Sequence, residues 1–262
     1  MSIFNAIRFR RGVGYIPDEP DSRDFSFDKL GLGSTELPPE VSMRSHVGMV
    51  LDQLSTNSCV ANAICNAIAI ADSSQNGITN PVLVSRLFAY YNARAYHGSE
   101  KFDDGTYLRY CIKGLVKFGM PNEVEHAFRV LRVNRRPSWN AYRKAFDRRG
   151  PSGYYRIFES GASRIQAIKS ALANGYPVCF GTPVDREFLR QDGPAVVGRM
   201  TGPIVGGHAM IWLGYRNRNG GDEFLTLNSY GRNYRDGGFV WMTDDVVADS
   251  NTRDLQVIKC AA

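Results

Sequence analysis

The sequence predicts an α+β protein, with helices in the N-terminal half of the chain and strands in the C-terminal half. Residues 59–72 ("CVANAICNAIAIAD") form a long run of small and apolar side chains, which is typical of a buried helix. After residue 150 the apolar runs become short and rich in β-branched and aromatic residues, as strands are. Asn219-Gly220 stands between two such runs, and this dipeptide favours the tight turn of a β-hairpin.

Further helices are predicted from start and stop signals along the chain. Ser85 is a candidate N-cap for "SRLFAYYNARAY", and Ser138 is one for the shorter "SWNAYRKAF". Between them, Thr106 is the candidate cap of "TYLRYCIKGLVKFG", which ends at Gly119. A later helix, "SRIQAIKSALANG", ends at Gly175.

The strands are predicted after residue 150. They are "GYYRIFE", "YPVCFGTPV", the two arms of the hairpin in "HAMIWLGYRNRNGGDEFLTLNS", and "GGFVWM". We therefore expect one domain over residues 41–262, with a helical lobe at about 45–150 and a β-rich lobe at about 151–262. A cleft between two such lobes is a natural place for a functional site.

Residues 1–45 show neither helical nor strand periodicity, and we expect residues 1–40 to form an extended N-terminal segment. The stretch "YIPDEPDSRDFSFD" is rich in Pro and Asp, which favours an extended segment. Such a segment either lies along the surface of the domain or is mobile.

The composition is that of an ordinary globular protein. The chain has 262 residues, of which 43% are hydrophobic and 22% charged, and its net charge is +6. Two basic clusters, 129–137 and 143–149, lack the interleaved aromatic residues of RNA and DNA binders, so we interpret them as solvated faces and expect no nucleic-acid partner. No run approaches the about 18 apolar residues that a membrane span requires. We expect a monomer.

The five cysteines are expected to be mostly free thiols. There are five, at positions 59, 65, 111, 179 and 260, and an odd number leaves at least one unpaired within the chain. No pair is spaced as CxxC and the histidines are scattered, so we expect neither a metal site nor a cofactor. The start of the chain has no secretory signal pattern, so synthesis in the cytoplasm with mostly free thiols is the simplest account. Cys260 is expected near a mobile C-terminus.

Three positions carry a pattern that points to chemistry. Cys59 follows the turn-forming residues Asn57 and Ser58, so it should lie in the first turn of its helix, where unpaired N–H groups favour a thiolate. His208 follows two glycines and opens an apolar strand, and Asn228 ends a strand before a Gly-rich loop. Each alone is more often structural, but a Cys near the N-terminus with a His far downstream and an Asn beyond it is the order found in thiol nucleophile sites.

On these residues the chain resembles the papain-like (cathepsin-like) cysteine peptidase family. The matching stretches are "LDQLSTNSCVANA", "GGHAMIWLGY" and "NSYGRNYRDGGFVWM". The intervening "SRLFAYYNARAYHG" and "DDGTYLRYCIKGLVKFGMPNE", and the earlier "YIPDEPDSRDFSF…LPPEVSMR", are similar to bacterial members. Together they cover most of residues 15–248 in family order. The resemblance implies a two-lobe fold with a barrel-like antiparallel C-terminal lobe and an active-site cleft between the lobes.

The resemblance also implies catalytic roles, position by position. Cys59 matches the nucleophile, His208 the general base and acid, and Asn228 the residue that orients the imidazole. Gln53 matches the glutamine whose side-chain amide forms the oxyanion hole with the backbone N–H of the cysteine. The substrate is then a protein or peptide, cleaved through a thioester.

Substrate-binding residues are placed by the same resemblance. Gly105, in "DDGT", matches the segment that pairs with the substrate backbone, and Gly207 flanks the cleft beside His208. Gly181 and Thr182 match the strand of the main specificity pocket. Tyr230 stands where the family usually has Trp, and it would shield the His–Asn hydrogen bond while needing a partner for its hydroxyl.

Several alternatives stay open. Asn57 and Val60 replace the family's usual Gly and Trp, which puts rate and substrate preference in doubt. The same catalytic set would serve an amidase, a transamidase or a cell-wall peptidase, and an inactive binding protein of this fold is the alternative from another class. Residues 1–40 are too short for a long propeptide, but they could wrap the lobes or occupy the cleft. Source and location are open, including a viral or phage enzyme or one exported by a non-classical route.

Overall fold

The computed structural model describes residues 11–32 and 36–260 of the chain. The α-helices are α1 (Cys59–Asn76), α2 (Arg86–Ala95), α3 (Leu108–Phe118), α4 (Trp139–Phe146), α5 (Gly161–Ala173) and α6 (Asp244–Ala248). The strands are β1 (Glu40–Ser42), β2 (Gly153–Arg156), β3 (Val178–Asp185), β4 (Val196–Val197), β5 (Ile204–Arg218), β6 (Gly221–Leu227), β7 (Phe239–Thr243) and β8 (Arg253–Lys259). The α+β class predicted from the sequence is confirmed.

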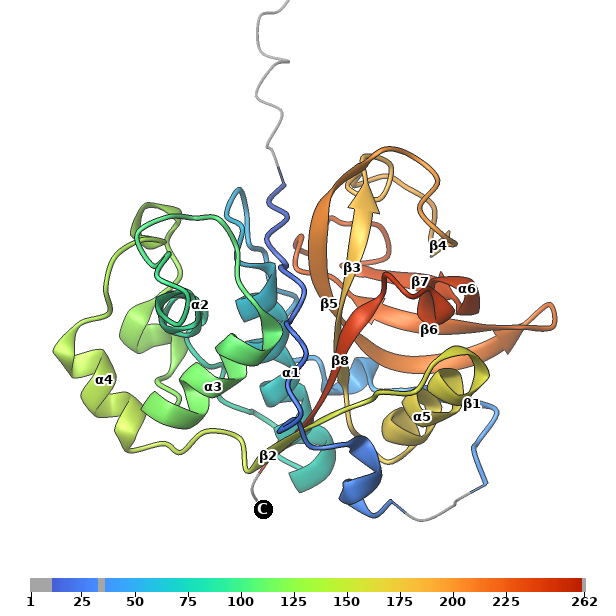
Figure 1. Cartoon of the computed structure of the whole chain (residues 1–262), viewed down its shortest axis with the longest axis horizontal. Helices are drawn as coiled ribbons and strands as arrows, with labels where there is room; N and C mark the ends of the chain where they lie inside the picture. Colours follow the sequence, from blue (N-terminus) through green and yellow to red (C-terminus); the bar gives the residue numbers. More distant parts are fainter. Residues whose placement is uncertain (1–10, 33–35, 261–262) are drawn as a thin grey trace, which may run out of the picture.

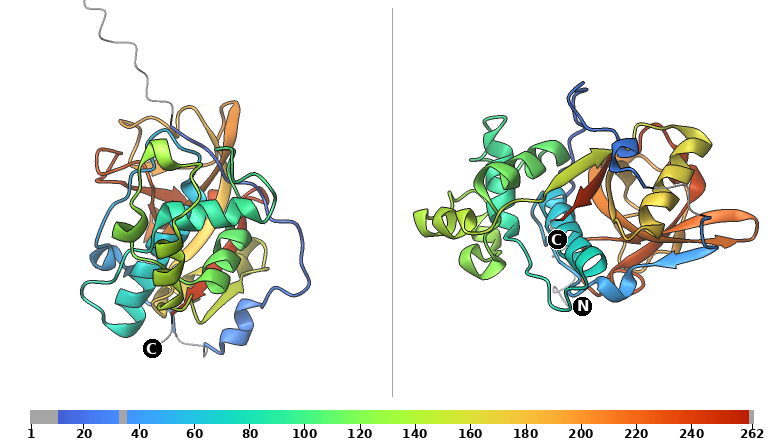
Figure 2. Two further views of the ribbon diagram at one scale, coloured as in Figure 1. Left: turned by 90° about the vertical axis from the view of Figure 1, so that its left-hand side faces the viewer. Right: turned by 90° about the horizontal axis from the view of Figure 1, so that it is seen from below.

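The helices and the sheet occupy opposite sides of the molecule. Helices α2, α3 and α4 lie on one side, the sheet lies on the other, and α1 runs between them (Figure 1). Seen from below, the two groups again lie apart, and α5 packs against the sheet (Figure 2, right). Within the described residues, no helix is long and apolar enough to cross a membrane.

The sheet is open rather than barrel-like. Its strand order is β2-β8-β3-β5-β6-β7-β4, with β1 paired to β5. Neighbours are antiparallel except for the parallel pair β4 and β7. Because the described strands end at β2 on one edge and β4 on the other, the sheet does not close, which corrects the barrel-like form expected from the sequence.

Helix α1 forms the centre of the molecule because its side chains are small. Ala61, Ala67 and Ala71 are fully buried, and they let neighbouring elements approach closely. The helix contacts α2 and α3 on one side and β3, β5 and β8 on the other. Its first residue, Cys59, therefore lies where the helices meet the sheet.

Most local signals in the sequence are confirmed. Ser85 and Ser138 accept hydrogen bonds from the N–H groups of Phe88 and Ala141, each at 3.2 Å, as N-caps do. The β5–β6 hairpin turns at Asn219-Gly220, where both residues have the positive φ (53° and 82°) that a type I′ turn requires.

Two expectations about local structure are wrong. Helix α3 begins at Leu108 with Tyr107 as its N-cap, so Thr106 is not the cap. The C-terminal region, expected to be mobile, forms β8 inside the sheet between β2 and β3, and Cys260 after it is buried. Hydrogen bonding on both edges of β8 supplies an order that its mixed polar and apolar sequence does not signal.

Residues 11–18 run along the boundary between the helices and the sheet (Figure 1). Gly14 O accepts a hydrogen bond from Thr106 N, just before α3, at 2.8 Å. Tyr15 N donates to Gly207 O on β5 at 3.0 Å. We call residues 11–18 the N-terminal strap, because their backbone joins the two sides of the molecule.

Candidate active site

The loop before α1 is held against the loop after β6. Gln53 N donates to Ser229 O, and Gly231 N donates to Leu51 O, both at 2.9 Å. These bonds form a short antiparallel pairing between segments that are far apart in the sequence. It brings the Gln53 loop next to Asn228.

Cys59 opens α1 and is fully buried. Its Sγ lies 3.4 Å from the N–H of Gly14 in the strap. Ser58 is the N-cap, but its hydroxyl bonds Thr56 Oγ1 at 2.7 Å and makes no capping bond. Burial raises the pKa of the Cys59 thiol to about 11, although backbone amides, including that of Gly14, favour the thiolate. With the strap in place, Cys59 is therefore a neutral thiol at neutral pH.

His208 is oriented by Asn228. The ring Nε2 lies 2.8 Å from Asn228 Oδ1, which can only accept, so Nε2 carries the proton of the neutral imidazole and Nδ1 is its basic nitrogen. Asn228 Oδ1 also accepts from Ser229 N at 2.7 Å. Burial lowers the pKa of His208 to about 4, since the charged ring has lost its water.

Tyr230 links the imidazole to the thiol region. Its ring stacks on His208 with centroids 4.7 Å apart, and its hydroxyl lies 3.3 Å from His208 Nδ1 and 3.3 Å from Gly12 O. Burial raises its own pKa, and the nearby Cys59 adds to the shift. In the part of the chain that the structure describes, no hydrogen bond joins the Cys59 sulfur directly to the His208 ring, and both groups border Tyr230.

Gln53 aims its side-chain amide at the strap. Its Nε2 donates to Gly12 O at 3.2 Å and to Thr56 O at 2.7 Å, and its Oε1 accepts from Ser229 Oγ at 2.6 Å. All three partners leave the amide group in one orientation. The Gly12 carbonyl therefore accepts from the donor that the resemblance assigns to the oxyanion hole.

The strap fits this site because two of its residues lack side chains. A Cβ on Gly12 would lie 1.8 Å from Thr56 O, and one on Gly14 would lie 1.9 Å from Asn57 O. Asn57, where the family usually has Gly, accepts from Val13 N through its side-chain oxygen at 3.2 Å. The asparagine at position 57, where the family usually has glycine, thus makes a hydrogen bond to the strap.

The other candidate residues lie around the same strap. Thr106 pairs with the strap backbone, accepting from Ile16 N at 3.1 Å as well as donating to Gly14. Gly105, the residue expected to pair, has φ +93°, and a Cβ there would meet Gly14 O at 2.2 Å. Gly105 therefore lets the strap backbone approach closely, while Thr106 makes the hydrogen bonds to the strap.

Gly181 and Gly207 face the Tyr15 side chain. A Cβ on Gly181 would lie 2.1 Å from the Tyr15 ring, and one on Gly207 would lie 2.9 Å from it. Thr182 is buried beside them and bonds Thr252 Oγ1 through its hydroxyl at 2.9 Å.

Sequence reasoning missed a buried charged cluster that anchors the strap. Arg156 pairs with Asp254 and with Asp24, and its guanidinium lies 3.6 Å from Asp18. Arg109 pairs with Asp24 at 2.5 Å. The Pro- and Asp-rich composition around residues 17–24 was a visible signal, but nothing local indicates which cations it meets.

This cluster predicts that the strap binds more tightly in acid. Three carboxyl groups (Asp18, Asp24, Asp254) share two guanidinium groups, and burial together with Asp254 raises the pKa of Asp18 well above its usual range. A carboxyl group whose pKa is higher in the folded than in the unfolded protein stabilises the fold fully at pH values below its pKa in the unfolded chain. This stability is lost as the pH rises through its pKa in the folded protein. Relative to a protein without this carboxyl group, we expect the Tm to fall between about pH 5 and pH 8, by about 2–4 °C per kcal/mol lost.

The matched comparison for this prediction is Asp18→Asn, which keeps the shape and removes the titration. Thermal unfolding should show a smaller fall over the same pH range in that variant. Equal pH dependence in the two proteins would contradict the assignment of the effect to Asp18.

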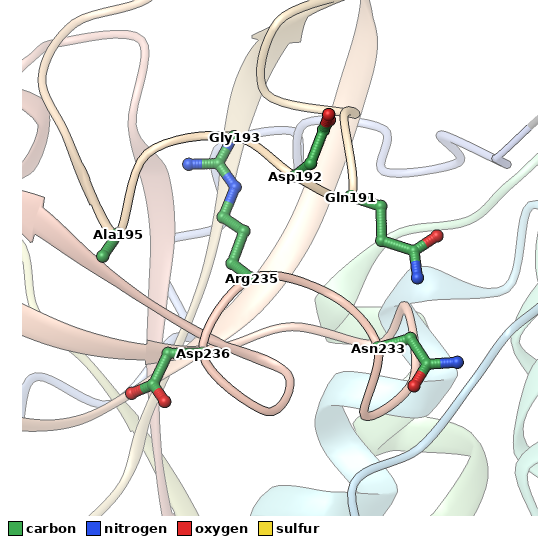
Figure 3. Close-up of a pocket in the computed structure, with 7 residues that line it drawn as sticks. All are labelled: Gln191, Asp192, Gly193, Ala195, Asn233, Arg235 and Asp236. Carbon is green, nitrogen blue, oxygen red and sulfur yellow. The ribbon is translucent and has the colours of Figure 1, made fainter.

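A polar hollow of about 670 Å³ lies at the Arg11 end of the strap. It is lined by Gln191, Asp192, Gly193, Ala195, Asn233, Arg235 and Asp236 (Figure 3). Arg235 extends toward the Gly193 loop and donates to Pro194 O at 2.6 Å. Arg11 lies 3.5 Å from Gln191 Oε1, so the strap begins at the rim of this hollow.

Comparison with known proteins places the chain in a family. No protein-family model matches it. The "uncharacterized peptidase C1-like protein L477" of Acanthamoeba polyphaga mimivirus is 31% identical over 265 residues, which span 92% of this chain and 84% of that protein. This chain belongs to the papain-like cysteine peptidase family. It is accordingly a hydrolase of the cysteine protease class, as the sequence resemblance implied.

Solved structures of papain-like peptidases have the same fold. Xylellain, a cysteine protease from Xylella fastidiosa, is 30% identical, with a TM-score of 0.82 and 97% of each chain covered. Digestive procathepsin L 3 of the Tenebrio molitor larval midgut is 16% identical, with a TM-score of 0.69, 96% of this chain and 76% of that one. A recombinant stem bromelain precursor is 15% identical, with a TM-score of 0.71, 97% of this chain and 79% of that one.

Proposed function

We propose that this papain-like peptidase is an endopeptidase that cleaves protein or peptide substrates through Cys59, His208 and Asn228. The observation that carries the proposal is the occupant of the site. A peptide segment of the chain itself passes Cys59 Sγ, with Gly12 on the Gln53 side and Tyr15 on the Gly207 side. A groove that accommodates backbone on both sides of the nucleophile suits cleavage within a chain.

The proposed reaction begins with transfer of the thiol proton to His208 Nδ1. The thiolate attacks the carbonyl carbon of the scissile bond, and the negative charge gathers on its oxygen. That oxygen takes the place of Gly12 O at Gln53 Nε2, together with the N–H of Cys59. His208, held by Asn228, then gives its proton to the leaving amine. Water hydrolyses the thioester and frees the acid.

The substrate backbone is proposed to bind as the strap does. Thr106 and Gly207 offer one donor and two acceptors to the strap, and Gly105 lets the backbone approach closely. Gly181 and Thr182 form a wall of the side-chain pocket, and Tyr230 covers the imidazole.

A quenched reaction followed by mass spectrometry tests this chemistry directly. We expect an acyl adduct on Cys59 during turnover of a peptide ester, and release of the free acid. Addition of an amine acceptor separates the alternatives, because a transamidase would divert most of the acyl group to the amine. An inactive binding protein would form no adduct on Cys59 even with the strap displaced.

Replacing Gln53 by alanine should reduce kcat by about 10²–10³-fold with little change in KM, because the lost donor acts on the charge that develops in the transition state. Steady-state hydrolysis of a peptide substrate, with both proteins carrying the strap-displacing Gly14→Val, measures the effect. The matched control is Gln166→Ala, an exposed glutamine on α5, which should leave kcat unchanged. A change in KM alone would mean that Gln53 binds substrate and does not stabilise the oxyanion.

We further propose that the strap blocks the site in a form that Cys59 does not cleave. The sulfur faces the N–H of Gly14, which is a hydrogen-bond donor and cannot be attacked. Gly12 O meanwhile engages Gln53 and Tyr230. The strap thus occupies the polar groups of the site and meets the sulfur through an N–H group.

A further inference from the structure

The strap places one large side chain in a pocket beside the nucleophile. Tyr15 directly follows Gly14, whose N–H meets Cys59 Sγ, and its own N–H bonds Gly207 O next to His208. The Tyr15 side chain is 6% exposed. Any residue whose side chain fills this pocket therefore has its backbone within one residue of the sulfur.

The walls of the pocket are shaped for a flat ring. A Cβ on Gly181 would lie 2.1–2.3 Å from three atoms of the Tyr15 ring, and one on Gly207 would lie 2.9 Å from a fourth. These two glycines stand on the paired strands β3 and β5, with Pro183 opposite Gly207. The absence of two side chains on neighbouring strands creates the space that the ring fills.

The end of the pocket carries a hydrogen-bond acceptor. The Tyr15 hydroxyl donates to Asp254 Oδ2 at 2.5 Å. Asp254 is 2% exposed and has a φ of +57°, a conformation that non-glycine residues rarely adopt and that tends to occur at functional sites. Burial and the charge of Asp254 raise the pKa of Tyr15, so its hydroxyl stays protonated as the donor.

Asp254 already has a cationic partner. Its other carboxylate oxygen pairs with the guanidinium of Arg156. A lysine or arginine side chain in the pocket would bring a second cation next to Arg156. A phenylalanine or leucine would fill the space but remove one of the two hydrogen bonds that Asp254 Oδ2 accepts, the other coming from Asp18 N at 2.7 Å, and this loss is unfavourable for a buried carboxylate. A neutral phenol satisfies both the shape and the acceptor.

We infer that the pocket of Gly181, Gly207 and Asp254 selects a tyrosine side chain next to the bond that the enzyme cleaves, and that Tyr15 of the strap occupies it as a stand-in for the substrate. The inference rests on the proposed peptidase activity and specifies its substrate class. Asp254 is then a specificity-determining residue that neither the catalytic set nor the sequence pattern identifies.

The test uses the full-length chain carrying Gly14→Val, which displaces the strap, and peptides that differ only in having Tyr, Phe, Leu or Arg at each position. We expect kcat/KM for the best tyrosine peptide to exceed that of its phenylalanine analogue by about tenfold to 100-fold, because a site built to bond a hydroxyl rejects the analogue without it. Asp254→Asn, whose side chain tolerates a positive φ, should reduce that ratio toward one while hydrolysis of the phenylalanine peptide persists.

A second variant tests the size of the pocket and leaves the hydrogen-bond acceptor Asp254 in place. Gly181→Val should lower kcat/KM for the tyrosine peptide far more than for peptides with glycine or alanine at that position, and so abolish the advantage of tyrosine. Hydrolysis with no tyrosine preference at any position, in the Gly14→Val protein itself, would overturn this inference and leave the peptidase proposal standing. Failure to hydrolyse any peptide, with Cys59 readily alkylated, would remove the peptidase proposal and this inference together.

Discussion

Replacing Cys59 by alanine is expected to reduce kcat/KM for peptide hydrolysis by at least about 10⁴-fold. The sulfur is the only atom proposed to form a bond to the substrate, and loss of a nucleophile leaves only the residual effect of the oxyanion donors and of binding. Alanine fits in place of the buried thiol at the start of α1, so the fold should be retained. The measurement is steady-state hydrolysis by Cys59→Ala and its parent, both carrying the strap-displacing Gly14→Val.

The matched control is another buried thiol outside the site. Cys260 follows β8, with its Sγ near Ile68 O at 3.6 Å. Cys260→Ala should keep the activity within about twofold of the parent, since the surface of the site is unchanged. If Cys59→Ala retained more than about 1% of the parent rate, catalysis would have to use another nucleophile.

Displacing the strap is expected to have the second largest effect. Gly14→Val places a side chain where a Cβ would lie 1.9 Å from Asn57 O, so the strap cannot remain docked. Water then reaches Cys59, and the pKa of its thiol falls from about 11 toward the values of about 3.5–7.5 that exposed thiols at helix N-termini have. We expect alkylation of Cys59 at neutral pH to become at least about 100-fold faster.

The rate of iodoacetamide labelling, with the site read by peptide mass spectrometry, measures this gain. Gly48→Val is the matched control, because nothing lies within 4 Å of a Cβ there and its backbone does not require glycine. That variant should react as the wild type does. Equal labelling of Cys59 in wild type and Gly14→Val, with thermal unfolding showing both proteins folded, would rule out the strap as a block.

Sequence signals were sufficient where the cause is local. A small-residue run defines α1, serine caps begin α2 and α4, and Asn219-Gly220 turns the β5–β6 hairpin. Each of these depends on a few neighbouring residues. The candidate positions Gln53, His208 and Asn228 are also predicted from the sequence, but only jointly and through the family resemblance.

The features that the sequence did not predict depend on contacts between segments that are far apart in the chain. Strand β8 is ordered by β2 and β3 on its two sides. Thr106 looked like a helix cap, but its backbone pairs with Gly14, which lies far away in the sequence. Asp254 had no signal at all, because its importance depends on Tyr15 and Arg156 meeting it in the fold.

The chain that follows the strap is attached to the rest of the molecule by contacts of its own. Arg109 holds Asp24, and further along the chain β1 pairs with β5. In the proposed blocking role, the strap is tied to its own enzyme and has a fixed local concentration, so latency would not weaken on dilution. Activation would then be reversible whenever the strap is only displaced from the site. It would become permanent only if the chain between Asp18 and Glu40 were cleaved.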